Sequence, residues 1–358
     1  MKPFFSMTFF LFCLSSVVYA AKPIPITNDM ILKSYLLPPS PRKLGRQTIL
    51  GIDSNKNGIR DDIERIIYNK SENPVERALM LQLARDYERI MRDPIGYAKK
   101  QKNAKDSSKS QDFKDSACER YIEDLLSIDF EKKYGKFLTI YLQDKYMNTK
   151  ERRRLYRRYN VALSGGVYSV PLFRDQKIEA CEFDVVSLVR EAYDKHTKIQ
   201  KQIVIDGHEL PLNPSRGYNN LTLLGVDVNH NGIRDDIEHY IFERYKEFDS
   251  YKKLRAVALQ YAYALQVILV DKEKAYGLLH DASQCRTYVI NQISADNWKS
   301  WSHNNKKFPI LDREFIDNQF NTYLRSQEYW KYTQLVKDRK MKEERTSKNS
   351  CNINIELL

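Results

Sequence analysis

One acidic stretch of twelve residues occurs twice in this chain, and it constrains the fold more than any other feature. DSNKNGIRDDIE runs from Asp53 to Glu64, and DVNHNGIRDDIE runs from Asp227 to Glu238. Each copy lies within a longer match, because TILGIDSNKNGIRDDIERIIY (48–68) aligns with TLLGVDVNHNGIRDDIEHYIF (222–242). A tandem duplication is the simplest explanation, and its long period predicts two domains rather than a solenoid of short repeats.

Further matches follow in the same order along both halves of the chain. They pair RALMLQLA (77–84) with RAVALQYA (255–262), SACERYIED (116–124) with SQCRTYVIN (283–291), YMNTKERRRLYRRY (146–159) with QFNTYLRSQEYWKY (319–332), and, more weakly, ACEFD (180–184) with SCNIN (350–354). We therefore expect a first domain over 26–200 and a second over 213–358. Residues 201–212 form a linker or a short hairpin that turns at Asp206-Gly207.

Helical patterns dominate both halves. The chain has 12 glycines in 358 residues, which favours helices over a β architecture rich in turns. Asn73 and Pro74 are typical of the cap and first turn of a helix. The sequence predicts a mainly α fold of two tandem, internally homologous helical domains, each opened by the acidic stretch and the helix that follows it. The tryptophans of the second half, Trp298, Trp301 and Trp330, are expected to anchor its core.

The acidic stretch fits the pattern D-x-[DN]-x-[DN]-G-x5-E and resembles an EF-hand calcium loop. Calcium prefers hard oxygen ligands, so short acidic and amide side chains must converge on one point, and the glycine lets the backbone turn sharply. The seventh position contributes only its backbone carbonyl. The resemblance implies Ca²⁺ as cofactor and the following ligands: Asp53, Asn55, Asn57, Ile59, Asp61 and Glu64 in the first loop, and Asp227, Asn229, Asn231, Ile233, Asp235 and Glu238 in the second.

Two departures separate these loops from an EF-hand proper. The eighth position is arginine, Arg60 or Arg234, instead of an apolar residue, and the residues before each loop contain proline and glycine, which oppose an entering helix. The loops are therefore more similar to the thrombospondin type 3 and dockerin kind, a loop with only an exit helix. We expect weak binding because arginine adds an opposing charge. The alternative is that Asn57-Gly58 is only a turn and that Asp61 and Glu64 form a helix capping box.

The first residues, MKPFFSMTFFLFCLSSVVYA (1–20), read as a secretory signal peptide. Lys2 precedes an apolar run, and Val18 and Ala20 supply small residues for cleavage after Ala20. An uncleaved membrane anchor is the alternative. No other apolar run approaches the length of a bilayer span, so we expect no transmembrane helix in the mature chain and a periplasmic or secreted location.

The mature chain contains Cys118, Cys181, Cys285 and Cys351. An even number of cysteines in an exported protein indicates disulfides. Because Cys118 aligns with Cys285 and Cys181 with Cys351, pairing within each half predicts Cys118–Cys181 and Cys285–Cys351. Free thiols or a metal site are the alternative, although the wide spacing does not match a zinc site.

No catalytic motif accompanies these features, and the sequence leans away from an enzyme. None of the 6 histidines belongs to an H-E-x-x-H motif. The net charge of +12 is compatible with an acidic envelope or extracellular partner, and a merely solvated basic surface is the alternative; no nucleic-acid-binding module is present. The favoured hypothesis is an exported calcium-binding protein with a structural or binding role, each repeat stabilised by calcium. The alternative is an exported hydrolase that acts on an envelope polymer with a pair of carboxylates.

Overall fold

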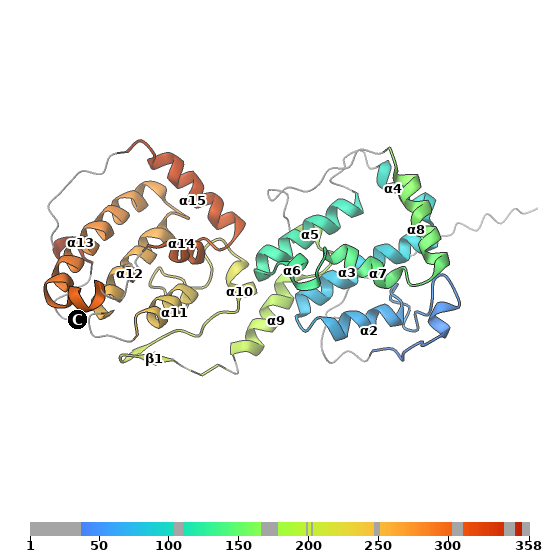
Figure 1. Ribbon diagram of the computed structural model, residues 1–358, viewed down its shortest axis with the longest axis horizontal. Helices are drawn as coiled ribbons and strands as arrows, with labels where there is room; N and C mark the ends of the chain where they lie inside the picture. Colours follow the sequence, from blue (N-terminus) through green and yellow to red (C-terminus); the bar gives the residue numbers. More distant parts are fainter. Residues whose placement is uncertain are drawn as a thin grey trace, which may run out of the picture.

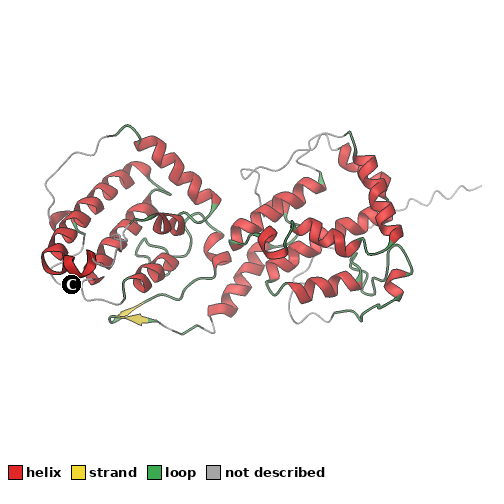
Figure 2. Ribbon diagram, viewed as in Figure 1, coloured by secondary structure: helices red, strands yellow, loops and turns green. Residues whose placement is uncertain are grey.

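The structure is a computed structural model that describes residues 37–103, 110–165, 178–197, 200–201, 203–246, 251–302, 311–339 and 348–352. The protein is mainly helical, as the sequence predicts, and one two-stranded hairpin is the only sheet in the described part of the chain. Figures 1 and 2 show the helices in two groups joined near α9 and α10. The expected signal peptide (1–20) lies outside the described residues.

The first group precedes the hairpin. Its elements are η1 (Leu44–Arg46), α2 (Asp61–Lys70), α3 (Pro74–Arg92), α4 (Pro94–Lys102), α5 (Gln111–Leu126), α6 (Phe130–Tyr134), α7 (Leu138–Tyr146), α8 (Lys150–Leu163), η4 (Ile178–Ala180) and α9 (Val185–Thr197). Helix α3 is the central element, because α2, α4, α5, α7, α8 and α9 all pack against it.

The second group follows the hairpin. The hairpin strands are β1 (Val204–Ile205) and β2 (His208–Glu209), and the helices after them are α10 (Arg216–Asn220), α11 (Asp235–Arg244), α12 (Tyr251–Val267), α13 (Lys272–Ser302), α14 (Arg313–Gln319), α15 (Tyr323–Val336) and η5 (Lys348–Ser350). Here α12 is central and packs against α11, α13 and α14.

Each group encloses its own hydrophobic core. The first core runs from Ile59 to Val189 along the chain, and the second runs from Ile233 to Tyr332. Ile59 and Ile233 occupy the seventh position of the two acidic stretches, so each loop is anchored by its isoleucine side chain. Trp330 is 62% exposed, so its expected role as a core anchor is wrong. The side chains of Trp298 and Trp301 lie outside the described residues.

Local sequence signals explain where several helices begin. The side chain of Asn73 accepts hydrogen bonds from the backbone N–H groups of Val75 and Glu76, which confirms the predicted cap of α3. Thr149 caps α8 and Thr322 caps α15 through the same type of bond to the third helical residue. Such bonds satisfy N–H groups that have no partner within the helix.

The hairpin packs against the second group. Its turn residues, Asp206 and Gly207, both have positive φ, as a tight hairpin turn requires. Asp206 pairs with Arg255 at 2.8 Å, and the ring of His208 stacks on Phe242 with centroids 4.6 Å apart. Residues 204–209 are therefore fastened to the second core rather than suspended between the two groups.

Both predicted disulfides are present. Cys118–Cys181 ties α5 to the segment before α9, and Cys285–Cys351 ties α13 to the segment after η5. This pairing confirms the prediction from the aligned cysteines. Within the described part of the chain, none of the helices combines the length and the apolar character that a bilayer span requires.

Candidate calcium loops

The backbone of each loop is folded around its first aspartate. The Asp53 carboxylate accepts hydrogen bonds from the N–H groups of Asn57 (3.1 Å) and Gly58 (2.9 Å). Asp227 accepts the corresponding bonds from Asn231 and Gly232, at 3.2 and 2.9 Å. Gly58 has φ +83°, a conformation that favours glycine. The sixth position therefore supplies the sharp turn that the sequence predicts.

The last glutamate of each loop reaches back from the exit helix to the loop amides. Glu64 is fully buried and accepts hydrogen bonds from the side-chain N–H groups of Asn57 (2.5 Å) and Asn55 (3.2 Å). Glu238 accepts the same bonds from Asn231 (2.7 Å) and Asn229 (3.0 Å). The structure thus brings together the predicted side-chain ligands at positions one, three, five and twelve of each loop.

These carboxylates lie in an unfavourable electrostatic environment. Burial raises the pKa of Glu64 to about 7, and the nearby Asp61 and Asp53 carboxylates add to the effect. Burial likewise raises the pKa of Asp235 to about 7 and raises that of Glu238. A cation beside a buried carboxylate favours the charged form, so each loop offers a place where positive charge would be stabilising.

The ninth-position aspartate of each loop bonds to the second residue of the loop. The Asp61 carboxylate accepts hydrogen bonds from the backbone N–H and the hydroxyl of Ser54, at 2.9 and 2.6 Å. Asp235 accepts from the backbone N–H of Val228 at 3.1 Å. In calcium loops of this kind the ninth position often acts through a water molecule, and the aspartate braces the loop here.

The capping-box interpretation of Asp61 and Glu64 is wrong. Helix α2 begins at Asp61, and its N-cap is Arg60, whose side chain makes no capping bond. Helix α11 begins in the same way, at Asp235 after Arg234. The glutamate at position twelve bonds to loop amides and not back to the N-cap. The carboxylates of Asp61 and Glu64 therefore bond to other loop residues and not to the N-cap.

The donor set of each loop fits a calcium ion better than a transition metal. Among the described residues, no group of three or more His, Cys, Asp or Glu side chains converges as a metal site. A calcium ion in either loop would therefore need amide and carbonyl oxygens as further ligands, and calcium accepts such neutral oxygens. The Asn57 side-chain oxygen accepts one bond, from the N–H of Ile59 at 2.9 Å. An amide oxygen has two lone pairs, so this oxygen keeps acceptor capacity for a cation.

The arginine at position eight does not oppose a cation in the loop, contrary to the prediction from its charge. Arg60 is fully buried and forms two parallel hydrogen bonds with the Asp62 carboxylate, at 2.9 and 2.7 Å. Its third nitrogen donates to the carbonyl of Tyr146 at 3.1 Å. Arg234 pairs in the same way with Asp236. The adjacent aspartate neutralises the arginine, which joins the loop to the end of α7 in the first group and of α14 in the second.

A second buried arginine in each group was missed at the sequence level. The Arg152 guanidinium donates to the carbonyls of Gly45, Thr48 and Ile49 at 2.7–2.9 Å. Arg325 donates to the aligned carbonyls of Asn219, Thr222 and Leu223 at 2.6–3.0 Å. The signal was the motif N-T-x-x-R, which begins at Asn148 and again at Asn321. These arginines hold the non-helical segment that enters each loop.

The segment that enters each loop ends in a glycine, which its backbone conformation and the nearby buried arginine require. Gly51 and Gly225 both have positive φ, at +72° and +78°. A Cβ atom at Gly51 would lie 2.8 Å from Arg60, and one at Gly225 would lie 2.4 Å from Arg234. The two buried arginines and the glycine therefore form one joint that fixes the approach to each loop.

Three aspartates of the first group line a cavity of about 280 Å³ away from the loop. Asp86 bonds to Arg89 and Tyr97, Asp115 accepts from the side chains of Gln82 and Gln111, and Asp112 accepts from Tyr159. Burial raises the pKa of Asp112 to about 6 and raises that of Asp115 well above its usual value. Each carboxylate is engaged inside the protein, and the carboxyls of Asp115 and Asp86 also hydrogen-bond to each other, so the cavity contains one pair of facing carboxyl groups.

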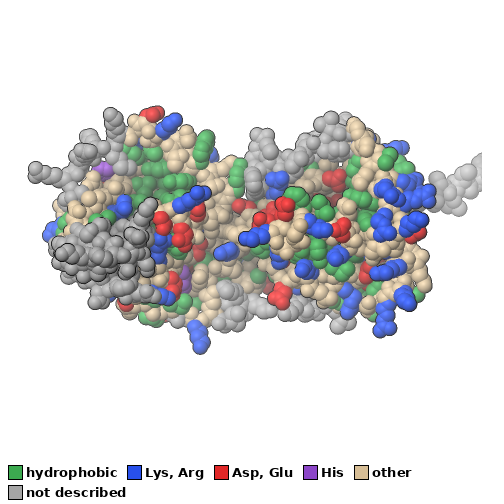
Figure 3. Space-filling view, viewed as in Figure 1, with side chains coloured by type: hydrophobic (Ala, Val, Ile, Leu, Met, Phe, Trp, Pro, Cys, Tyr) green, Lys and Arg blue, Asp and Glu red, His purple; other side chains and the backbone are tan. Residues whose placement is uncertain are grey.

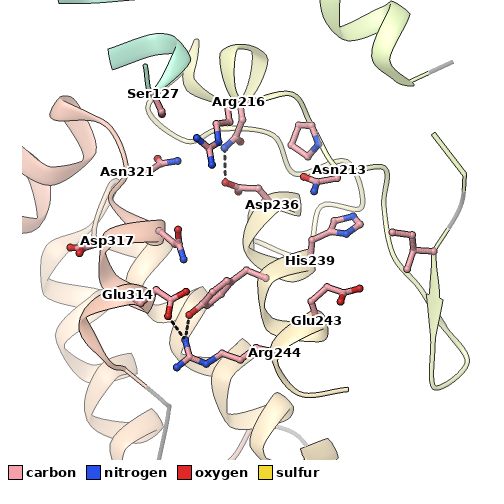
Figure 4. A pocket seen from close by; sticks show the side chains of 15 residues that line it. Ser127, Asn213, Arg216, Asp236, His239, Glu243, Arg244, Glu314, Asp317 and Asn321 are labelled. Carbon is pink, nitrogen blue, oxygen red and sulfur yellow. Dashed lines mark hydrogen bonds and ion pairs between the residues drawn. The ribbon is translucent and has the colours of Figure 1, made fainter. Parts of the chain in front are cut away.

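A wider groove of about 910 Å³ lies where the two groups of helices meet (Figure 4). Ser127 lines it from the first group, and Arg216, Asp236 and Arg244 line it from the second. Asp236 accepts from Asn219 at 2.9 Å and also holds Arg234, while Arg244 bonds to Tyr240 and Asp312. Asp236 and Arg244 are therefore both engaged in contacts within the protein.

Comparisons with protein-family models, with curated proteins and with solved structures found no match for this chain.

Proposed function

We propose that this protein is an exported calcium-binding protein with a structural or binding role, in which one Ca²⁺ at each loop stabilises the helix that follows. One observation carries the proposal. In both loops, a buried glutamate from the first turn of the exit helix faces the side-chain amides of positions three and five. A folded chain tolerates a buried carboxylate when it is paired or coordinates a metal.

The ligand set is the one that the resemblance to calcium loops implies. Asp53, Asn55, Asn57 and Glu64 would hold the ion in the first loop through side-chain oxygens, Ile59 would contribute its carbonyl, and Asp61 would brace the loop. The second loop offers the aligned residues from Asp227 to Glu238. The ion supplies positive charge beside the buried glutamate, and its binding free energy adds to the stability of the folded state.

We also propose that the two halves share an ancestor. Support comes from contacts that the aligned residues make in both groups. Gln82 bonds to the backbone of Ala180 and Glu182, beside Cys181, and Gln260 bonds to the backbone of Ser350 and Asn352, beside Cys351. Arg77 and Arg255 each donate to the C-cap carbonyl of the preceding helix.

Export is supported by the signal-like residues 1–20 and by the two disulfides, which persist in oxidising compartments.

Calorimetric titration of the mature chain with calcium tests this function. We expect two sites with dissociation constants of about 10⁻⁴–10⁻³ M, the range of extracellular modules. At about 1 mM free calcium, each site would stabilise the protein by roughly 0.4–1.4 kcal/mol. Asp53→Ala should remove one site, Asp227→Ala the other, and the double variant both.

A matched control removes a carboxylate outside the loops. Glu72 is exposed and follows the C-cap of α2, so Glu72→Gln should leave both binding heats unchanged. An unchanged melting temperature together with no binding heat at several millimolar calcium would contradict the proposal. Equal calcium binding by the double variant would place any binding outside the two loops.

A further inference from the structure

One end of the molecule carries a dense array of exposed cations. They lie on α4 and α8, two helices that pack side by side, and Figure 3 shows Lys and Arg side chains gathered at this end of the molecule. We name this surface the basic face and define it by Lys99, Lys100 and Lys102 of α4 and Lys150, Arg153, Arg154, Arg157 and Arg158 of α8. Glu151 is the one exposed carboxylate within these two helices.

The basic face is not neutralised by the part of the protein that the structure describes. No side chain of the basic face forms an ion pair with a carboxylate of the described residues. Lys102 and Arg153 instead donate to the backbone carbonyls of Ser164 (2.5 Å) and Met147 (3.0 Å). Carboxylates gather elsewhere: the half-buried Glu123 and the exposed Asp129 and Glu131 line a cavity of about 640 Å³ near the middle of the molecule. The cations of the basic face are therefore unpaired, and this group of carboxylates lies in a different part of the molecule.

The fold does not require this charge. Helix α15 aligns with α8 and begins with the same Thr cap and buried arginine, yet its residues at the positions of Arg153, Arg154 and Arg157 are Ser326, Gln327 and Trp330. A helix can thus occupy this position in the architecture without a row of arginines. The cations of α8 serve something outside the scaffold.

Exposed aliphatic side chains accompany the cations. Val161, one turn after Arg157 and Arg158 on α8, is 74% exposed, and Leu44 of η1, flanked by Lys43, is 57% exposed. The carbonyl of Gly45 accepts a hydrogen bond from Arg152, so η1 lies beside the start of α8. The tyrosines of α4 and α8 face inward, where Tyr97 stacks on Tyr159 with centroids 6.0 Å apart. The surface therefore offers charge and aliphatic contact but no aromatic platform for nucleic-acid bases.

We propose that the basic face docks the protein on a bilayer rich in anionic phospholipids. Clustered Lys and Arg side chains are attracted to acidic headgroups, and neighbouring aliphatic side chains enter the boundary between headgroups and acyl chains. The protein would bind as a peripheral protein through α4, α8 and η1. This docking does not depend on calcium in the loops, because the basic face supplies the charge itself.

Vesicle co-sedimentation of the mature chain, with excess chelator, tests the proposal. Phosphatidylcholine vesicles that contain phosphatidylglycerol should bind the protein, vesicles of phosphatidylcholine alone should not, and salt should weaken binding. The variant Arg153→Gln/Arg154→Gln/Arg157→Gln/Arg158→Gln should lower the partition coefficient by about fivefold for each charge removed. The same four arginines changed to lysine should retain most of the binding, which separates loss of charge from loss of fold.

A second quadruple variant controls for net charge. Lys252→Gln/Lys274→Gln/Arg313→Gln/Lys337→Gln removes four exposed cations from the second group, and its partition coefficient should fall by less than about fivefold in total. Equal losses in the two glutamine variants would overturn the proposal, since net charge alone would then govern binding. Absence of a preference for anionic vesicles would overturn it too. Tight binding of duplex DNA or heparin through the same arginines, without vesicle binding, would assign the surface to a soluble polyanion instead.

Discussion

Helices α8 and α15 begin in the same way and then present different surfaces. Both are capped by the threonine of N-T-x-x-R, and in both the arginine of that motif is fully buried against the carbonyls of the loop approach. After that turn, α8 exposes arginines, whereas α15 exposes Trp330 (62%); Leu324, within the first turn of α15, is also exposed (58%). The joint at the start of the helix is common to the two groups, and the surface beyond it is not.

The interiors differ in the same manner. Asp86 and Asp115 are buried in the first group, and alanine occupies both aligned positions in the second, Ala264 and Ala282. A hydrogen bond between Tyr146 and Glu88 has a counterpart between Gln319 and Gln266. A side-chain hydrogen bond is thus present at the same place in both groups, although both of its residues differ.

This comparison separates what the fold needs from what each half adds. The shared contacts are the loop turn, the paired arginine and aspartate at its end, the arginine of N-T-x-x-R and the disulfide. A glutamine that bonds to the backbone beside the disulfide, Gln82 or Gln260, is shared as well. The additions are the acidic cavity and the basic face of the first group, and the exposed Leu324 and Trp330 of the second. Predictions about shared contacts should hold equally in both groups, and predictions about additions should not.

The largest expected effect concerns the buried arginines of the shared joint. Arg152→Met or Arg325→Met would leave several loop carbonyls without donors, which we expect to destabilise the group concerned by about 3–5 kcal/mol. Hydrogen exchange read by mass spectrometry would show lost protection around Gly51 for the first variant and around Gly225 for the second. Arg154→Met, an exposed neighbour on α8, serves as the control and should change stability by less than about 0.5 kcal/mol. A strong effect in only one group would break the comparison.

The disulfides should rank next, with matched effects. Replacing both cysteines of Cys118–Cys181 or of Cys285–Cys351 by alanine should cost about 2–4 kcal/mol in each case, because the unfolded chain loses a constraint. The closed loops have sequence separations of 63 and 66 residues, so the loop-closure contributions differ by less than about 0.1 kcal/mol. Urea unfolding of the two double variants measures this. A difference above about 1 kcal/mol would mean that packing around the two bridges is not equivalent.

Sequence patterns predicted the features that depend on short-range signals or on the alignment of the two halves. The helical class, the cap at Asn73, the turn at Gly58 and both disulfides are all of this kind. The ligands of the calcium loops remain a prediction, although the structure gathers the residues at positions one, three, five and twelve. Periodicity, capping chemistry and aligned cysteines carry such information without knowledge of the tertiary fold.

The features that were missed depend on contacts far apart in the sequence. Arg60 looked like an unfavourable charge in the loop, since its spacing gives no sign that it bonds to Asp62 and to the carbonyl of Tyr146. The direction in which a long side chain leaves a loop is set by the elements packed around it, here α7. Arg152 was visible only as part of a basic helix, and its partners lie more than one hundred residues earlier in the chain.

The next effect concerns pH and two carboxyls of the first group, Glu119 and Asp112; Asp235 of the second group, whose pKa burial raises to about 7, adds an effect of the same sign there. Burial raises the pKa of Glu119 to about 7 from an ordinary value of 4.5, and that of Asp112 to about 6 from 3.8. Between these values the folded state binds protons that the unfolded state does not, so the free energy of unfolding should rise as the pH falls from about 7.5 to 5.5. We expect a gain on the order of 1–2 kcal/mol.

Hydrogen exchange in α5 and α13 at the two pH values would measure this gain, after correction for the intrinsic exchange rate. The residues aligned with Glu119 and Asp112 are Arg286 and Leu279, so α13 should lack the contribution of these two carboxyls. Glu119→Gln should remove part of the gain in α5. An equal rise in protection of α5 in this variant would show that other groups are responsible.

The smallest effect would distinguish the two calcium loops. Arg85 of α3 is buried beside the first loop, where its guanidinium lies 3.4 Å from the Asn57 carbonyl and is attracted to Asp53 and Glu64. The aligned residue of α12 is Tyr263, whose ring packs against Gly232. A fixed cation competes with Ca²⁺ for the same carboxylates, so the first loop should bind calcium about threefold more weakly than the second. Arg85→Tyr should remove this difference, since a Cβ atom built on Gly58 meets no atom within 4 Å and the ring has room to pack.

Calorimetric titration of single-loop proteins, made with Asp227→Ala or Asp53→Ala, would measure each affinity separately. Arg92→Gln removes an exposed charge from the same helix and should leave both affinities unchanged. Equal affinities in the unmodified loops would show that Arg85 is already neutralised by Glu182, its other carboxylate neighbour.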